Sequence, residues 1–149
     1  MRTIDTEPSS PLRAELQSAC IVCGPDHPHG LHLEFDLASD GSVSAQWTPA
    51  EGWQGFRGII HGGIVSTVLD EAMAKAVAAV GKALTGELRV RFRHPVAPGE
   101  DLRIRGWIVE RTRRVIRAEA TLTTLDGCER AHAWSAFLPP AGKEEDFAG

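Results

Sequence analysis

Residues 58–81 read GIIHGGIVSTVLDEAMAKAVAAVG and contain the one long helical pattern of this 149-residue chain. Apolar side chains recur there at intervals of three and four residues, which is the spacing of a helix with one buried face. They are Ile64, Val65, Val68, Leu69, Ala72, Met73, Ala76 and Val80. Gly81 follows the last of them and is typical of a helix end. We therefore predict one long central helix.

The predicted helix begins unusually, because His61 is followed by two glycines, Gly62 and Gly63. The first N–H groups of a helix have no partner within it, and they lie at the positive end of its dipole. Glycines at this place let atoms of another molecule come close to these donors. The sequence thus predicts that a polarised oxygen binds at the start of the helix.

Two neighbouring carboxylates, Asp70 and Glu71, lie along the same helix. At about 100° per residue, Asp70 falls at the rim of the apolar face, where a carboxylate needs a polar partner or a ligand. Glu71 has Lys75 one turn further on, which favours a solvated ion pair. We interpret Asp70 as functional and Glu71 as structural.

The rest of the chain has the alternating pattern of half-buried strands, separated by turn residues such as Asp40-Gly41 and Asp126-Gly127. One helix among short-linked strands predicts an α+β fold in which an antiparallel sheet wraps around a single helix. One helix cannot cover both faces of such a sheet, so we expect a second copy of the chain to cover a face or an edge. The predicted strands are 31–38, 42–48, 85–96, 102–109, 115–125 and 129–138.

Composition narrows the class of protein. A net charge of −4 and a pI near 5.8 argue against a nucleic-acid binder. No apolar run approaches the roughly 20 residues that span a bilayer, and the start of the chain lacks a signal-peptide core, so we expect a cytoplasmic protein. The predicted organisation is an arm over 1–19, with a short helix over 11–18, one domain over 20–139 and a disordered tail over 140–149.

A C-x-x-C pair, Cys20 and Cys23, precedes His27, His29 and His32, and these are ligand types that zinc uses. No second cysteine pair follows, and His32 alternates with leucines in a predicted strand. We therefore predict a structural turn with buried thiols and no bound metal.

The stretch Gly55 to Met73, GFRGIIHGGIVSTVLDEAM, resembles the hotdog-fold acyl-coenzyme A thioesterases, in particular the phenylacetate-pathway type. Asp70 lies nine positions after His61, as in that family, and Thr85 lies ten positions before Pro95, where relatives carry Ser or Thr. The resemblance implies a hotdog fold and no cofactor, since coenzyme A is part of the substrate. It also implies that the Gly62 N–H polarises the thioester carbonyl, that Asp70 is the nucleophile or general base, and that Thr85 orients the water or the acid.

Other residues are expected around the substrate. His61 and Gly63 flank the predicted carbonyl site, Trp53 is a candidate wall of the acyl pocket, and Gln54 is the candidate for an Asn or Gln that relatives carry near this place. Arginine side chains suit the phosphates of coenzyme A. The candidates for that contact are Arg91, Arg93, Arg113 and Arg114.

We thus expect hydrolysis of acyl-coenzyme A to a carboxylic acid and free coenzyme A. A non-enzymatic acyl-coenzyme A sensor and a hotdog dehydratase or hydratase are the alternatives. Gly62 and Asp70 are eight residues apart, which is about 12 Å along one helix, so we expect two antiparallel chains to form each site. The predicted assembly is a homodimer, with a homotetramer as a dimer of dimers, and neither nucleic acid nor a membrane is an expected partner.

Overall fold

The computed structural model describes residues 18–140. The arm expected over 1–19, the short helix expected over 11–18 and the tail expected over 140–149 lie outside the described residues except for 18, 19 and 140. The elements are β1 (Asp36–Leu37), β2 (Val43–Trp47), the short 3-10 helix η1 (Glu51–Trp53), α2 (Gly62–Ala78), β3 (Leu84–Phe92), β4 (Leu102–Arg111), β5 (Ile116–Thr124) and β6 (Glu129–Leu138).

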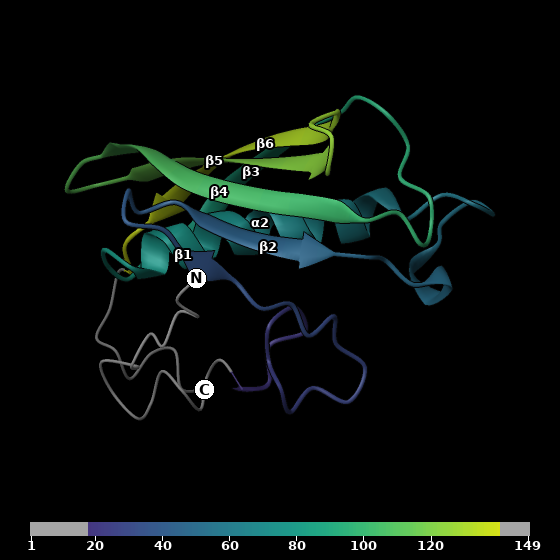
Figure 1. The fold of residues 1–149 in the computed structure, drawn as a ribbon. Coiled ribbons are helices and arrows are strands. Elements are labelled where there is room, and N and C mark those ends of the chain that lie inside the picture. Colours follow the sequence, from purple (N-terminus) through teal and green to yellow (C-terminus); the bar gives the residue numbers. More distant parts are fainter. Residues whose placement is uncertain (1–17, 141–149) are drawn as a thin grey trace.

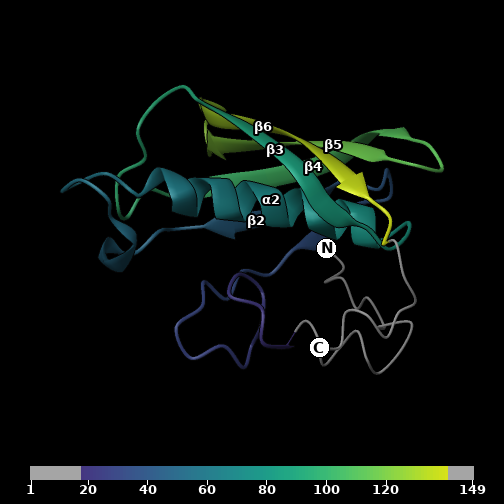
Figure 2. The ribbon, with the colours of Figure 1, turned by 180° about the vertical axis from the view of Figure 1, so that it is seen from behind.

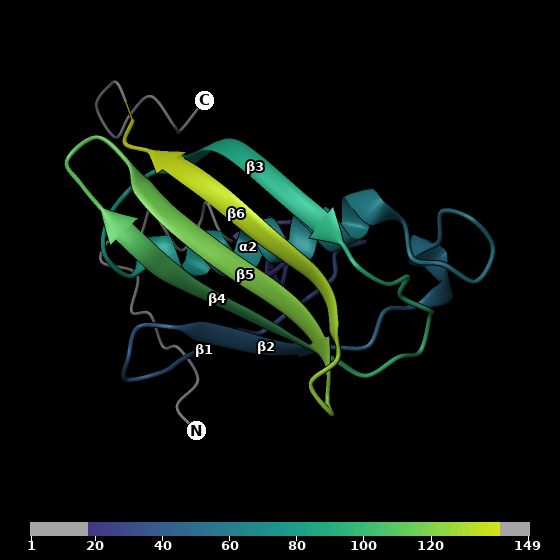
Figure 3. The ribbon, with the colours of Figure 1, turned by 90° about the horizontal axis from the view of Figure 1, so that it is seen from above.

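The six strands form one antiparallel sheet in the order β1-β2-β4-β5-β6-β3. Helix α2 lies along one face of this sheet, which curves over it (Figures 1 and 2). Seen from above, β3 and the short β1 are the two edges (Figure 3). The predicted α+β architecture, an antiparallel sheet wrapped around one long helix, is confirmed.

Most of the apolar face predicted for the helix packs on the sheet, whereas the predicted Val80 lies beyond the helix end and is exposed. The fully covered side chains of the helix are Val65, Val68, Leu69, Ala72, Met73, Ala76 and Val77. They meet the inward residues of the strands, where alternate positions such as Leu102, Ile104, Ala120 and Leu122 are buried. Burial of these side chains from both layers forms the core that holds α2 against the sheet.

Helix and sheet approach each other closely at Gly106 of β4. A Cβ atom on Gly106 would lie 2.6 Å from the carbonyl oxygen of Ala72. Only a residue without a side chain allows this approach. Gly106 thus sets the distance between α2 and the middle of the sheet.

The first predicted strand is mostly not a strand. Leu33 and Phe35 are buried and Glu34 is exposed, as the alternation predicts. The backbone N–H groups of Leu31 and Leu33, however, bond to the carbonyls of Ile21 and Val22 in the preceding turn. Only Asp36–Leu37 pairs with β2.

The connection after β3 also differs from the prediction. The sequence suggested strands joined by short turns, but β3 and β4 are not neighbours, and residues 93–101 carry the chain across to β4 on the other side of β5 and β6. The strand ends at Phe92 because the N–H groups of Arg93 and His94 bond to the carbonyl of Arg130. Apart from the first strand, the predicted strands and the long helix are thus correct in kind and shifted at their ends, with α2 ending at Ala78 before Gly81.

The edge strand β3 is exposed along nearly its whole length, and it carries apolar side chains. Leu84 is 55% exposed, Leu88 38% and Phe92 53%. An exposed edge with such side chains is a surface on which another strand can pair. No helix of the described chain is long and apolar enough to cross a membrane.

Candidate active site

At the start of α2, the backbone N–H of Gly63 donates a hydrogen bond and that of Gly62 does not. His61 is the residue before the first helical position, and its Nδ1 accepts a hydrogen bond from the N–H of Gly63 at 2.8 Å. Among the described residues, no group accepts a hydrogen bond from the N–H of Gly62. Since Gly62 is exposed, this N–H is available to a ligand oxygen at the positive end of the helix dipole.

Asp70 has the polar partner that its position requires. The Thr85 hydroxyl on β3 donates a hydrogen bond to Oδ1 of Asp70 at 2.8 Å. Burial raises the pKa of Asp70 above its ordinary value, and the Thr85 hydrogen bond opposes this rise. Asp70 is therefore a carboxylate with increased affinity for a proton, held in a fixed orientation.

A bulge in β3 accounts for the contact of Thr85 with the helix. The pairing with β6 shifts between Thr85 and Glu87, so one extra residue interrupts the alternation. Thr85 consequently lies on the helix side with Val90, which packs against the core. Without the bulge it would share the outer face with Arg89, whose guanidinium lies over Trp134.

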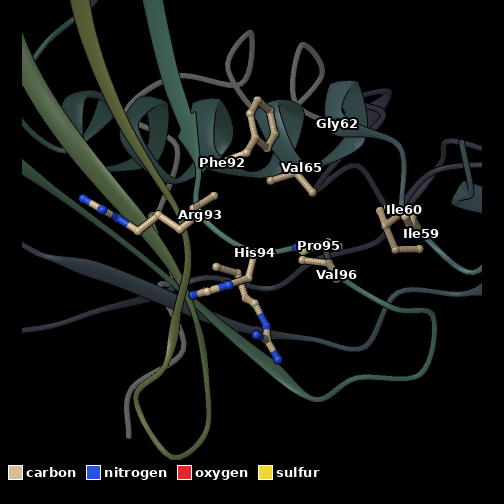
Figure 4. Close-up of a pocket in the computed structure, with 11 residues that line it drawn as sticks. Ile59, Ile60, Gly62, Val65, Phe92, Arg93, His94, Pro95 and Val96 are labelled. Carbon is tan, nitrogen blue, oxygen red and sulfur yellow. The ribbon is translucent and has the colours of Figure 1, made fainter. Parts of the chain in front are cut away.

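A pocket of about 320 Å³ opens beside Gly62. Its walls are mostly apolar, with Phe92 and Val65 next to the helix start and Arg93 and His94 on the chain after β3 (Figure 4). A Cβ atom on Gly62 would lie 3.4 Å from the Phe92 ring, so the ring stands directly against this glycine. Arg93 was a predicted site residue, but Phe92, His94 and Arg130 were not, because only the pairing of the end of β3 with the start of β6 brings them here.

The loop before the helix uses the polar atoms of Gln54 internally. Nε2 of Gln54 donates to the carbonyl of Glu51 at 2.8 Å, and Oε1 accepts from the N–H of Gly58 at 2.7 Å. Trp53 is partly buried, and its carbonyl accepts a hydrogen bond from the N–H of His61. Gln54 therefore shapes the loop that leads to His61, and the predicted contacts of Trp53 and Gln54 with substrate stay predictions.

The candidate arginines divide into two groups at opposite ends of α2. Arg93 lines the pocket at Gly62 and pairs with Glu129, whereas Arg91 is exposed on β3. Arg113 and Arg114 lie in the exposed turn between β4 and β5, which reaches the helix end, where Arg111 bonds to the carbonyl of Val80. One chain thus does not bring all four to a single phosphate group.

Asp70 and the Gly62 N–H are not brought to one centre within a chain. They lie eight residues apart on α2, which is about 12 Å along the axis. Groups that act on one reacting carbonyl must lie roughly 3 Å from it. One chain therefore presents the two halves of a possible site at separate places.

Outside the pocket at Gly62, Cys20, Cys23 and Glu71 have ligand atoms that all lie within 4.8 Å of one another. The thiols are only partly buried, and the predicted Glu71–Lys75 ion pair is present at 3.9 Å. Its two side chains are 16% and 20% exposed, so this pair is less solvated than predicted. These three residues could hold a metal, and the absence of bound metal stays a prediction.

The model of the thioesterase superfamily matches residues 57–130 of this chain. A solved protein of that superfamily is 28% identical with a TM-score of 0.76 and covers 80% of this chain, which spans only 62% of that protein's length. A mutant of the phenylacetic acid degradation protein PaaI from Thermus thermophilus is 22% identical with a TM-score of 0.68, covering 74% of this chain and 95% of its own.

A hypothetical thioesterase from Streptococcus pneumoniae, solved with coenzyme A, is 18% identical with a TM-score of 0.68. The alignment covers 75% of this chain and 88% of that one. At such identities these last two structures show a shared fold. No curated protein sequence matches this chain.

Proposed function

Since the chain belongs to the thioesterase superfamily and has its hotdog fold, we propose that it hydrolyses the thioester bond of acyl-coenzyme A molecules. The observation that carries this proposal is the Asp70–Thr85 pair, a partly buried carboxylate held by a hydroxyl at 2.8 Å. The S. pneumoniae protein of the same fold was solved with coenzyme A, which supports coenzyme A as the carrier of the acyl group.

In the proposed reaction, the Gly62 N–H donates a hydrogen bond to the thioester oxygen. A donor fixed in this way stabilises the negative charge that develops when the carbonyl carbon is attacked, and such a donor contributes about 10²–10³ in rate. The N–H of Gly63 cannot donate to the thioester oxygen, because it already donates to the His61 ring. His61 and Gly63 thus position the donor that acts.

Asp70 is proposed as the general base. It removes a proton from water as the water oxygen attacks the thioester carbon, and the carbon–sulfur bond then breaks to release coenzyme A as a thiolate. The raised pKa of Asp70, due to burial, increases its affinity for that proton. Thr85 orients the carboxylate through its hydrogen bond.

The site is proposed to form between two copies of the chain, related by a twofold axis. Gly62 and Asp70 lie about 12 Å apart along α2, so one helix cannot bring both groups to one reacting carbon. Thr85 lies on the edge strand β3, whose apolar side chains are exposed, so a second copy paired there would approach Asp70 and Thr85. The Gly62 N–H and Arg93 of one chain would then face Asp70 of its partner, with Arg113 and Arg114 beside the same site.

A thiol-release assay tests the function directly. Aryl, short-chain and long-chain acyl-coenzyme A substrates should include at least one that the protein hydrolyses, and Asp70→Asn should reduce that turnover by about 10²–10⁴. Glu71→Gln is the matched control on the next residue and should retain turnover. Tight binding without thiol release from any substrate would contradict the proposal in favour of a sensor.

A single turnover in isotopically labelled water tests whether Asp70 acts as a nucleophile whose own carboxyl carbon is attacked by water in the second step. A general base leaves the Asp70 carboxylate unlabelled, and the label appears in the product acid. Label found in the Asp70 peptide after one turnover would show a covalent intermediate and would overturn the role assigned here.

A further inference from the structure

A cluster of two thiols, a carboxylate and an ammonium group lies outside the proposed hydrolytic site. Cys20, Cys23 and Glu71 are mutually within 4.8 Å, and Lys75 pairs with Glu71 at 3.9 Å. The chain that carries the cysteines, purple in Figure 1, passes on the side of α2 opposite the sheet. The proposed hydrolysis uses none of these four residues.

We propose that Cys20 and Cys23 form a thiol–disulfide exchange site, in which Cys20 attacks a low-molecular-weight disulfide and Cys23 resolves the resulting mixed disulfide. The C-x-x-C turn brings both sulfurs to one place, and both side chains are partly exposed. A reagent in solution can therefore reach Cys20, and its neighbour can complete the exchange without a change of fold.

The surroundings of Cys20 favour its thiolate. The N–H of Val22 donates a hydrogen bond to the Cys20 sulfur at 3.4 Å. The pKa of Cys20 is lowered to about 5, mainly because the Cys23 thiol donates a hydrogen bond to it. Burial opposes this change, and the positive charge of Lys75 adds a smaller lowering effect. As a thiol, Cys20 would instead donate to Glu71 at 3.8 Å. The thiolate is the nucleophilic form.

Cys23 and Glu71 suit the second step. The pKa of Cys23 is raised, because it is the donor to Cys20, because it is partly buried and because Glu71 carries negative charge nearby. Cys23 therefore keeps its proton until Cys20 has reacted. Its hydrogen bond with Glu71 gives that proton a carboxylate acceptor.

The exchange balances with oxidised glutathione as the disulfide. The Cys20 sulfur forms a bond with one glutathione sulfur, and the second glutathione leaves as a thiolate. Cys23 then transfers its proton to Glu71 and attacks the Cys20 sulfur, which releases the first glutathione as a thiolate. Two electrons pass from the protein to the small disulfide, and a Cys20–Cys23 disulfide remains.

The same cluster is less suited to zinc. Structural zinc sites have four ligands, and the described residues supply three here. The ammonium group of Lys75 also lies beside the one carboxylate ligand. A positive neighbour stabilises a thiolate and opposes a dication, so the arrangement favours exchange over metal binding.

Peptide-resolved mass spectrometry of the full chain tests the proposal. Reduced protein is exposed to oxidised glutathione, trapped with an alkylating reagent and digested with trypsin, which places Cys20 and Cys23 on peptide 14–57 and Cys128 on peptide 118–130. We expect peptide 14–57 to lose two hydrogen atoms while Cys128 is alkylated. In the unmodified protein at about pH 6, iodoacetamide should alkylate Cys20 roughly tenfold faster than an unperturbed thiol, because a greater thiolate fraction outweighs the lower nucleophilicity.

Three variants complete the test. Cys23→Ser should accumulate glutathione on Cys20. Glu71→Gln, in otherwise unmodified protein, should slow the loss of that adduct. Cys128→Ser, the matched control at an exposed thiol, should change neither step. Equal or faster reaction of Cys128, or retention of the wild-type exchange rate in Cys20→Ser, would overturn the proposal. One zinc ion per chain, lost in Cys20→Ser, would also overturn it by showing a metal site.

Discussion

Thr85 donates a hydrogen bond to Oδ1 of Asp70 at 2.8 Å, and this bond connects edge strand β3 to the middle of helix α2. This hydrogen bond lowers the pKa of Asp70 against the larger, opposite effect of burial. Loss of the Thr85 hydroxyl should therefore appear in the pH dependence of hydrolysis. A change to a residue that merely packs nearby would alter the rate without moving its pH profile.

We predict that Thr85→Val shifts the acid limb of the kcat profile to higher pH. A general base works only when deprotonated, so activity falls as pH drops through its pKa. The substitution removes a hydrogen bond that lowers this pKa, and the limb moves upward. Thr85→Ser keeps a hydroxyl and should restore the limb to its original place. A profile that is lower but unmoved in Thr85→Val would contradict this account.

Asp70→Asn should increase stability at neutral pH. Burial raises the folded-state pKa of Asp70 above 3.8, so the folded chain holds this proton more tightly than the unfolded chain. That contribution to stability is complete below 3.8 and is lost as pH rises through the folded-state pKa. Asparagine carries no charge to bury and still accepts from Thr85.

Urea unfolding checks this prediction in both proteins. Near pH 7 the variant should have the higher midpoint, and the advantage should shrink as pH falls toward about 4. An Asp70→Asn protein that is less stable near neutral pH would show that the carboxylate stabilises the fold.

Gly62→Pro should remove the proposed carbonyl donor with little effect on the fold. Gly62 is the first helical residue, where proline is well tolerated. His61 has φ −55° and ψ 131°, a conformation that a following proline permits. Turnover should fall by about 10²–10³ as expected for loss of one such donor.

Gly62→Ala is the matched control, because it adds the same first carbon and keeps the N–H. Its Cβ would meet the Phe92 ring at 3.4 Å, which is an ordinary contact. Thermal unfolding should show both variants folded. Similar activity in the two variants would remove Gly62 from the proposed mechanism.

Gly106→Ala should destabilise the fold by about 1–3 kcal/mol through overpacking. The added carbon would lie 2.6 Å from the Ala72 carbonyl oxygen, so helix and sheet would have to separate. Gly52→Ala, where nothing lies within 4 Å of the added carbon, is the control for glycine replacement. Equal urea midpoints for the two variants would contradict the close approach.

The sequence predicted the parts of this molecule that depend on local pattern. The buried face of α2, the Glu71–Lys75 pair and the alternation of β4 to β6 follow from spacing alone. The position of β3 at the far edge does not, because pairing of strands distant in the sequence depends on the whole sheet. The bulge at Thr85 was missed for the same reason, since it exists only against β6.

The candidate site shows the same division. The motif identified His61, Gly62 and Asp70, but it did not show that His61 takes the Gly63 N–H and leaves that of Gly62 unused. The C-x-x-C pair predicted buried thiols, whereas the turn leaves both cysteines partly exposed beside Glu71 on the outer side of α2. Side-chain hydrogen bonds between residues more than a turn apart required the structure.

The last prediction concerns the shared site. Gly62→Pro subunits lack the donor but keep Asp70, and Asp70→Asn subunits lack the base but keep the Gly62 N–H. If each site takes Gly62 from one chain and Asp70 from the other, a mixed dimer has one site with both groups and one with neither. Random exchange makes half of the dimers mixed, so about a quarter of wild-type activity should return from two inactive parents.

Subunit exchange has to be demonstrated in the same mixture, for example by native mass spectrometry of isotopically labelled and unlabelled chains. A mixture of Gly62→Pro with Gly62→Ala/Asp70→Asn double-variant subunits is the matched control. In its mixed dimers the double-variant chain supplies the N–H at position 62, because alanine keeps it, and the Gly62→Pro chain supplies Asp70. Activity should therefore return there too. If exchanged dimers stay as inactive as either parent, Gly62 and Asp70 do not act across the interface, and the 12 Å separation within one helix would need another explanation.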